Sequence, residues 1–314
     1  MTLKTFLEVV EIRTKVASLF PFIMGVLFSM SYFQEVHWGY TALFFLGMLI
    51  FDMTTTAINN YMDFKKAKSE EYKYEHNVIG KEQLSPKLVQ RMILGMLAFT
   101  MLLGLFLAWQ TGWLVLIMGG AMCFIGVFYT FGPIPLSRMP LGEIFSGVTM
   151  GLGIFAMTIY LNTLEQKIFY LDLDFQAGTF GLTGQLWSVL VILLASLPLV
   201  FTIANIMLAN NLRDLETDIK NHRYTLVYYI GRKQGILLFK GLMYSCYLVL
   251  LLGLFLSLYR WPILVSFLTF PKIHRNLQEH EASLPHPRSF GYAIKNMILF
   301  NSSYALGLFI SLFL

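Results

Sequence analysis

The sequence predicts an all-α membrane protein in which nine transmembrane helices form one bundle. Three observations favour this fold class. Hydrophobic residues make up 56% of the chain and charged residues only 13%, whereas an average soluble domain carries about 25% charged residues. Apolar runs long enough to cross a hydrocarbon core of roughly 30 Å recur along the chain. A five-residue polar motif occurs twice, each time at the end of such a run, which indicates an internal repeat.

The nine predicted spans are the successive apolar runs. The first is interpreted as a helix and not as a signal peptide, because it has no small-residue cleavage site and the chain stays apolar beyond it. The eighth begins with Trp261-Pro262 and is shorter than the others. The expected spans are 17–33, 40–61, 92–109, 113–131, 141–161, 187–209, 241–258, 261–273 and 293–314.

The positive charges of the loops predict how the chain is oriented. With nine spans, 21 of the 23 Lys and Arg residues fall on one side, and only Lys167 and Arg260 fall on the other. Since loops rich in Lys and Arg stay in the cytoplasm, we expect the N-terminus inside and the C-terminus outside a bacterial plasma membrane. The net charge of +5 is explained by loops that face anionic membrane lipid, so no nucleic acid is expected as a partner.

The polar motif Asn-Asn-x-x-Asp closes the second and the sixth span. In the second copy Asn210, Asp214 and Asp218 follow one another at intervals of four residues. Residues four apart lie on one face of a helix, about 6 Å apart along its axis. Four spans separate the copies, so both are expected at the cytoplasmic ends of parallel helices in a four-helix repeat. Two such faces would form a ring of oxygen ligands for Mg²⁺ and a phosphorylated substrate. The expected ligands are Asn59, Asp63, Asn210, Asp214 and Asp218.

Basic residues follow both copies of the motif and are candidates for binding an anionic phosphate beside the metal. They are Lys65, Lys66, Arg213 and Arg223, although each taken alone also fits a plain topology signal. The two longest cytoplasmic loops, near 64–90 and 219–234, follow the two copies, and we expect them to cap the site. The two cysteines lie inside apolar spans and the six histidines show no metal-ligand spacing, so no disulfide framework or thiolate metal site is expected.

The second motif and its surroundings resemble the second Asp-rich motif of the UbiA-type intramembrane prenyltransferases. The similarity is greatest to the menaquinone branch, which acts on 1,4-dihydroxy-2-naphthoate. The matching stretch runs from Asn210 to Asp218 and continues with Arg223. The first motif with Lys65-Lys66 fits the same branch, and so does the stretch from Tyr129 to Pro135 followed by Leu141-Gly142-Glu143. The resemblance covers essentially the whole chain and implies a UbiA-like bundle, a single domain of residues 1–314.

The resemblance implies a Mg²⁺-dependent reaction. A polyprenyl group passes from polyprenyl diphosphate to 1,4-dihydroxy-2-naphthoate, pyrophosphate and CO₂ are lost, and demethylmenaquinol forms in menaquinone biosynthesis. Asp63, Asp214 and Asp218 are then expected to be catalytic. The motif asparagines, including Asn60 and Asn211, are expected to contact the substrate.

Two details of this chemistry concern side chains near the motifs. The allylic cation that forms when the diphosphate leaves needs aromatic faces and protection from water. Tyr61 and Tyr129 lie nearest to the motifs and are the candidates. Position 67 is Ala, so the acid that completes the first cluster is left open between Glu70 and Glu71.

Two further acids are candidates for catalysis. Asp52 shares a helix face with Asp63 but lies about 16 Å deeper by helical rise. An acid at that depth either orients the aromatic acceptor and takes its proton, or is a protonated group hydrogen-bonded between helices. Glu143 opens the fifth span level with the Asp clusters, as an acceptor-side residue or as a favourable charge at a helix N-terminus. Gly147 and Gly151 form a small-residue pair that predicts close helix packing.

Two other functions are consistent with the same pattern. A UbiA-type enzyme with a different aromatic acceptor would need the same metal site. A secondary transporter would also explain an internal repeat and the intramembrane Asp52. Transporters, however, keep their polar sites near the middle of the membrane, whereas here the acids gather at one face.

Overall fold

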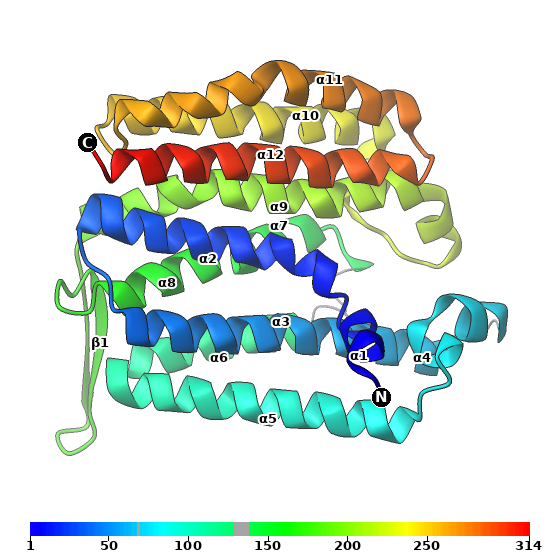
Figure 1. The fold of residues 1–314 in the computed structure, drawn as a ribbon, viewed down its shortest axis with the longest axis horizontal. Coiled ribbons are helices and arrows are strands. Elements are labelled where there is room, and N and C mark those ends of the chain that lie inside the picture. The colour runs from blue at the N-terminus through cyan, green and yellow to red at the C-terminus, as the bar shows by residue number, and fades with distance from the viewer. Residues whose placement is uncertain (68–69, 129–137) are drawn as a thin grey trace.

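The computed structural model describes residues 1–67, 70–128 and 138–314, and these residues are mostly helical. The long helices run side by side along one direction, so the molecule is a bundle with two ends (Figure 1). The N-terminal helix lies toward one end and the C-terminus at the other (Figure 1). The predicted all-α bundle is therefore confirmed, with one short β-hairpin added.

The first helices lead the chain into the bundle. Thr2 caps α1 (Leu3–Val9) by accepting a hydrogen bond from the backbone N–H of Thr5. Glu11 then adopts a left-handed conformation with φ of 47° and turns the chain. Because of this turn Lys15, at the base of α2, points inward with only 5% of its surface exposed. The elements are η1 (Ile12–Lys15, 3-10), α2 (Val16–Phe28) and the π turn η2 (Ser29–Phe33).

The first motif lies in the last turns of α3 (Trp38–Lys66). The chain then forms the π turn η3 (Tyr72–His76) and α4 (Val78–Lys81). This part of the predicted cap packs against α1 and α3 around the buried Ile79. The side-chain amide of Asn77 donates to the backbone carbonyl of Asn60 at 2.9 Å, so α4 is attached directly to the first motif.

The next two helices form a helical hairpin beside α3. Pro86 occupies the first turn of α5 (Pro86–Thr111), where its missing N–H costs nothing. Gly112 then turns the chain with φ of 108°, a value that other residues rarely adopt. α6 (Trp113–Phe128) runs back beside α5.

A continuous helical run corresponds to the fifth predicted span. It consists of α7 (Gly142–Ser146), the π-helical η5 (Gly147–Gly153) and α8 (Ile154–Asn162). A Cβ atom on Gly151 would lie 2.6 Å from the backbone nitrogen of Val200, and one on Gly147 would lie 2.8 Å from the carbonyl oxygen of Val200. The predicted packing role of this glycine pair is therefore confirmed.

A short antiparallel hairpin separates α8 from α9. β1 (Phe169–Asp174) pairs with β2 (Thr179–Gly184), with Phe169 opposite Gly184. The hairpin extends across the end of the bundle at which the C-terminus lies (Figure 1). No strand was predicted in this segment.

The second motif lies near the end of the longest helix, α9 (Leu186–Lys220). Its 35 residues span about 52 Å, well beyond a hydrocarbon core of roughly 30 Å. Pro198 lies inside α9 without interrupting it. α10 (Leu226–Phe255) follows, with a change of direction at Gly231, where φ is 79°. The chain ends with η6 (Trp261–Thr269, 3-10), α11 (Phe270–Ser283) and α12 (Arg288–Ser311).

The number of spans agrees with the prediction in part. Within the described residues, seven helical segments are long and apolar enough to cross a membrane. α6 is apolar but has only 16 residues. The eighth predicted span, 261–273, corresponds to η6 and the start of the more polar α11. The count of nine therefore stays a prediction. The seven are Ile12–Phe33, Trp38–Lys66, Pro86–Thr111, Gly142–Asn162, Leu186–Lys220, Leu226–Phe255 and Arg288–Ser311.

The packing divides the bundle into two sides. The largest apolar core lies where α9 meets α10, α12, α2 and α8. A smaller core joins α1, α3, α4 and α5. In Figure 1, α9 to α12 lie on one side, α3, α5 and α6 lie on the other, and α2 with α7 and α8 lies between them. α3 and α9 both end at the same end of the bundle, which we call the motif end (Figure 1).

Candidate active site

A cavity of about 500 Å³ lies between the two sides of the bundle. Its walls come from α2, α3, α5, α6, α8 and α9, together with the end of α7 and η5. Most of the lining is apolar. On α3 the lining runs from Phe44 to Asn59, a length of about 22 Å along the helix. The cavity is therefore long enough to cross much of the membrane.

The lining changes in character along α3. Toward the start of the helix the cavity is bounded by Phe44, Met48 and Phe51, and toward the motif end by Asp52, Thr55, Thr56 and Asn59. The wall is thus apolar at one end and polar at the other. A molecule with a hydrocarbon tail and a polar head fits this arrangement in one direction only.

Glycines form part of the opposite wall. Gly104 of α5 and Gly119, Gly120 and Gly126 of α6 all line the cavity. A Cβ atom on Gly104 or Gly120 would meet no other atom within 4 Å. The absence of side chains at these positions therefore adds to the free space.

The two motifs flank the same mouth of the cavity. On α9 the lining residues Ile203 and Met207 are followed on the same helix face by Asn210 and Asp214. On α3 the lining ends with Asn59, one turn before Asp63. The structure therefore brings the two motif ends to one place, as expected. α3 and α9 lie on opposite sides of this opening.

The second motif is bound by its own arginine. Arg213 donates from Nε to Oδ1 of Asp214 at 2.6 Å and from Nη2 to Oδ2 of Asp214 at 2.5 Å. Nη2 also donates to the amide oxygen of Asn210 at 2.6 Å. Two of the three expected ligands on α9 thus bond to one guanidinium. The third, Asp218, is buried and lies 3.5 Å from Nη1 of Arg223.

Arg223 connects the two motifs electrostatically. Its positive charge acts on the carboxylate of Asp218 and also on that of Asp63. Its Nε is buried and has no hydrogen-bond partner among the described residues. An arginine with an unused donor between two carboxylates is suited to bind an anion at the mouth.

In the first motif, in contrast, the side chains of the two expected ligands are unpaired among the described residues. Asn59 lines the cavity and Asp63 is exposed, and neither side chain has a hydrogen-bond or ion-pair partner within the described part of the chain. Lys65 is exposed near the end of α3. The charge of Lys66 acts on Asp63.

Two expected substrate contacts prove to be packing contacts. The side-chain amide of Asn60 donates to the backbone carbonyl of Val9 at 2.9 Å and to Glu11 at 3.2 Å, which ties α3 to the N-terminal segment. Tyr61 packs with the apolar core around Ile79 and does not line the cavity. The structure thus gives both residues a role in packing, and their predicted contact with substrate gains no support from it.

Asn211 and Glu143 form a buried pair. The amide of Asn211 donates to Oε1 of Glu143 at 2.8 Å, and Glu143 is only 4% exposed. This bond joins α7 to α9 behind the second motif. Neither residue lines the cavity. Oε2 of Glu143 has no partner among the described residues. Asn211 therefore positions Glu143 and makes none of the expected contact at the mouth.

Three candidate residues, which lie in or next to stretches of the chain outside the described residues, stay predictions. Tyr129, like the rest of the stretch to Pro135, lies outside the described residues. Glu70 and Glu71 are exposed and make no hydrogen bond or ion pair within the described ranges. The acid that completes the first cluster therefore stays open.

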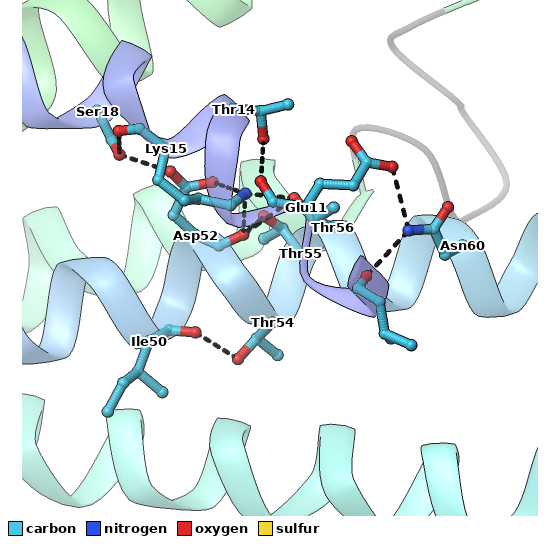
Figure 2. A network of polar contacts seen from close by, with 11 residues as sticks. Glu11, Thr14, Lys15, Ser18, Ile50, Asp52, Thr54, Thr55, Thr56 and Asn60 are labelled. Atoms are coloured by element: carbon cyan, nitrogen blue, oxygen red, sulfur yellow. Dashed lines mark hydrogen bonds and ion pairs between the residues drawn. The ribbon is translucent and has the colours of Figure 1, made fainter. Parts of the chain in front are cut away.

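Asp52 forms an ion pair inside the bundle (Figure 2). Nζ of Lys15 donates to Oδ1 of Asp52 at 2.8 Å and to the hydroxyl of Thr56 at 2.5 Å. The hydroxyl of Ser18 donates to Oδ2 of Asp52 at 2.5 Å. Asp52 and Ser18 also line the cavity. A buried cation thus balances the acid, which differs from the protonated carboxyl considered as the alternative.

Lys15 and Ser18, which bind the carboxylate of Asp52, were not predicted as site residues from the sequence; of the two, Ser18 lines the cavity. Lys15 was interpreted only as a positive charge near the cytoplasmic face. A signal did exist, because a carboxylate at the depth of Asp52 needs a partner. Lys15 and Ser18, three apart at the base of the first span, lie on one helix face.

The ligand types at the mouth fit Mg²⁺. Carboxylate and amide oxygens are the ligands that this ion prefers. The motif carboxylates do not converge on one point within the described residues; Asp214 is paired with Arg213, and Asp218 lies beside Arg223. The one described group of three acidic or histidine side chains whose ligand atoms lie within 4.8 Å of one another is Glu35, His37 and Glu165, at the other end of the bundle. The oxygens that the second motif would offer to a metal ion are hydrogen-bonded to Arg213.

Comparison with known proteins identifies the family of the fold. Residues 18–284 match the model of the UbiA prenyltransferase family. The chain is 28% identical over 266 residues to the 1,4-dihydroxy-2-naphthoate octaprenyltransferase of Bacillus subtilis (strain 168), which covers 83% of this chain and 76% of that protein.

Solved structures agree with this match. The UbiA homologue of Aeropyrum pernix K1, in its apo form, superposes with a TM-score of 0.65 at 12% identity and covers 96% of this chain and 97% of its own. The UbiA homologue of Archaeoglobus fulgidus, bound to GPP and Mg²⁺, superposes with a TM-score of 0.62 at 12% identity and covers 99% and 100%. With the family model matched over most of its length, the chain belongs to the UbiA prenyltransferase family.

Proposed function

We propose that the protein transfers a polyprenyl group from polyprenyl diphosphate to 1,4-dihydroxy-2-naphthoate, giving demethylmenaquinol, pyrophosphate and CO₂. The observation that carries this proposal is the cavity. It is mostly apolar, and one of its ends lies beside the oxygen-bearing side chains of the two motifs. The similar protein from Bacillus subtilis, named for a naphthoate acceptor, supports the choice of acceptor.

The diphosphate would be held at the mouth of the cavity. Mg²⁺, when bound, supplies the charge that stabilises the departing diphosphate. Its proposed ligands are Asn59, Asp63, Asn210, Asp214 and Asp218. Arg223, with its unused Nε, donates to the diphosphate oxygens. Lys65 and Lys66 add positive charge as the leaving group becomes more negative.

The apolar cavity would protect the reacting carbon. One C–O bond of the allylic diphosphate breaks, and one C–C bond to the naphthoate ring forms. The carboxylate carbon of the acceptor leaves as CO₂. The apolar lining excludes water from the allylic cation. Phe44 and Phe51 line the cavity and present aromatic faces to that positive charge.

Asp52 would orient the acceptor. It is the acid that lines the cavity below the motifs, and Lys15 and Ser18 fix its carboxylate in place. A carboxylate held in this way accepts a hydrogen bond from an acceptor hydroxyl, takes its proton as the new C–C bond forms, and returns it to the same oxygen as the bond from the ring to the carboxylate breaks and CO₂ leaves. Glu143 is too enclosed for this role, and we assign it to holding α7 against α9.

The proposed setting is a bacterial plasma membrane. The motif end carries most of the basic loops, so we place it and the N-terminus on the cytoplasmic side. A charged diphosphate would then reach the mouth from the cytoplasm, while its hydrocarbon tail enters the apolar cavity from the bilayer.

An acceptor assay tests the proposed function. Purified protein with Mg²⁺, geranyl diphosphate and carboxyl-labelled 1,4-dihydroxy-2-naphthoate is expected to release labelled CO₂ and one pyrophosphate per turnover. The Asp52→Asn variant is expected to raise the KM for the acceptor more than that for the diphosphate. Prenylation of 4-hydroxybenzoate in preference to the naphthoate would overturn the assignment of acceptor.

The same assay separates the remaining alternatives. A different aromatic acceptor would show as pyrophosphate release with another ring compound. A transporter would show no pyrophosphate release with any acceptor. The polar groups at one end of the cavity and the uninterrupted α9 give no support to transport.

A further inference from the structure

Arg213 occupies the oxygen atoms that the second motif offers to a metal ion. Its guanidinium bonds to both carboxylate oxygens of Asp214 and to the amide oxygen of Asn210, all at 2.5 to 2.6 Å. Charge-assisted, bidentate pairs of this kind are among the strong hydrogen bonds of proteins. Each hydrogen bond occupies a lone pair, and the positive charge of the guanidinium repels a divalent cation, so Arg213 competes with a metal ion for these oxygens.

This pair contributes little to the fold, as a comparison with Arg232 shows. Arg232 of α10 donates to both carboxylate oxygens of Glu216 at 2.7 Å and to the backbone carbonyl of Leu212, so it fastens α10 to α9. Arg213, Asp214 and Asn210 instead lie within one turn of the same helix. Their hydrogen bonds to one another join no two elements, and α9 is already held by its backbone hydrogen bonds. A role in ligand binding explains the pair better than a role in packing.

The charges around the second motif also cancel. Asp214 faces Arg213 and Asp218 faces Arg223, so two negative charges meet two positive ones. A divalent cation gains little Coulomb energy from a site without net charge. The guanidinium carbon of Arg213 lies 5.2 Å from the ring centre of Phe290 on α12, which keeps the arginine at the mouth.

We propose that Arg213 is a latch that closes the second motif to a bare divalent cation and opens it to a cation that arrives with a diphosphate. A diphosphate offers the guanidinium anionic oxygens in exchange for those of Asp214, so the arginine keeps an ionic partner when it moves. The inference rests on the proposed function, because it takes polyprenyl diphosphate as the ligand that opens the latch.

The latch predicts an order of binding. Asn59 and Asp63 have no partner among the described residues, so the first motif is open to a metal ion at all times. The second motif accepts a metal ion only together with the diphosphate. Both motifs therefore hold metal only when the substrate is present.

Binding of Mn²⁺ to the full-length protein in nanodiscs tests this order, because bound Mn²⁺ loses its sharp EPR signal. An Asp63→Asn background disables the first motif, so that binding reports on the second. Without diphosphate, adding Arg213→Gln to this background is expected to strengthen Mn²⁺ binding by roughly tenfold or more, since a competing cation is removed. An unchanged affinity would overturn the latch.

The diphosphate is expected to reverse this effect. With geranyl S-thiolodiphosphate present, which resists ionisation, the single Arg213→Gln variant is expected to bind Mn²⁺ with the probe about tenfold more weakly than the unmodified protein, since a diphosphate contact is lost. Tighter or equal binding by the variant would contradict the transfer of Arg213 to the diphosphate.

Arg232→Gln in the Asp63→Asn background is the matched control. It also frees one carboxylate on α9, that of Glu216, and so measures the gain from an unpaired acid alone. If Arg213→Gln strengthens Mn²⁺ binding no more than Arg232→Gln, the latch is refuted.

Arg213→Lys replaces Arg213→Gln in this experiment if the glutamine variant fails to elute as a folded protein. An intermediate Mn²⁺ affinity is then expected, because lysine keeps the charge but not the three contacts. No binding of the Mn²⁺-loaded probe by the unmodified protein would overturn the proposed function itself.

Discussion

The two copies of Asn-Asn-x-x-Asp share their spacing, but the fold gives them different electrostatic surroundings. In the first copy the side chains of Asn59 and Asp63 have no partner within the described ranges. In the second copy Asn210 and Asp214 are both bonded to Arg213. The same residue types thus occur in both copies, but only the second copy has a neighbouring arginine that occupies their side-chain oxygens.

The second asparagine of each copy is similar in a different respect. Asn60 ties α3 to the N-terminal segment, and Asn211 ties α9 to α7 through Glu143. In both copies the first asparagine and the aspartate face the mouth, while the asparagine between them fixes the motif to a neighbouring element. The motif thus contains residues that we propose to bind metal and residues that hold the motif in place.

The largest expected effect is the loss of either aspartate. Asp63→Ala and Asp214→Ala are each expected to lower turnover by roughly a thousandfold or more, because each removes a proposed metal ligand at the departing diphosphate. Pyrophosphate release measures this, and EDTA is expected to stop the unmodified enzyme. A near-normal rate for Asp63→Ala alone would contradict the proposal that both motifs hold metal, since only the second motif would then be needed.

Arg223 is expected to matter to both motifs. Arg223→Gln should lower kcat/KM for the diphosphate by roughly tenfold to a hundredfold, because it removes a charged donor at the mouth. Double-mutant cycles with Asp63→Asn and Asp218→Asn then show whether both carboxylates depend on it. Zero coupling with Asp63 would contradict an arginine shared by the two motifs.

The two anchoring asparagines are expected to affect stability. Asn211→Ala leaves the buried carboxylate of Glu143 unpaired and should cost about 1–3 kcal/mol, whereas Asn60→Ala, which is only half-buried, should cost about 1 kcal/mol. Thermal unfolding in detergent measures the difference. A larger loss for Asn60→Ala would mean that the first motif is the more rigidly held.

The smallest expected effect is that of Tyr61→Phe. Because Tyr61 packs away from the cavity, the loss of its hydroxyl is expected to leave turnover and both KM values unchanged. Phe51→Leu is the matched change on the cavity wall, and it is expected to lower turnover because an aromatic face is lost beside the reacting carbon. Equal losses in both variants would show that Tyr61 acts at the site after all.

The helices and the motif faces follow from local patterns. Apolar runs predicted the long helices, and the spacing of Asn59 with Asp63 and of Asn210 with Asp214 predicted which residues share a face. Helical geometry also turns Tyr61 away from the face of Asn59, since the two residues are related by a rotation of about 200°. Its choice as a site residue relied on nearness in sequence and ignored the direction of the side chain.

Other features depend on contacts that no local pattern contains. The ion pair of Lys15 and Asp52 requires α2 to cross α3 at one height, which follows from the turn at Glu11. The bond between Asn211 and Glu143 depends on the close approach that Gly147 and Gly151 allow. The hairpin of β1 and β2 has strands of only six residues, too short to distinguish from a loop by alternation.

The bare glycine wall of the cavity has a consequence for how this enzyme type diversifies. Gly104 and Gly120 face open space, so a side chain added there would project into the lumen without disturbing a packed neighbour. Larger side chains at these two positions of α5 and α6 are therefore expected to narrow the cavity and to shorten the isoprenoid chain that the proposed reaction accepts. The proposed oxygen ligands lie on α3 and α9, so such changes would leave them in place.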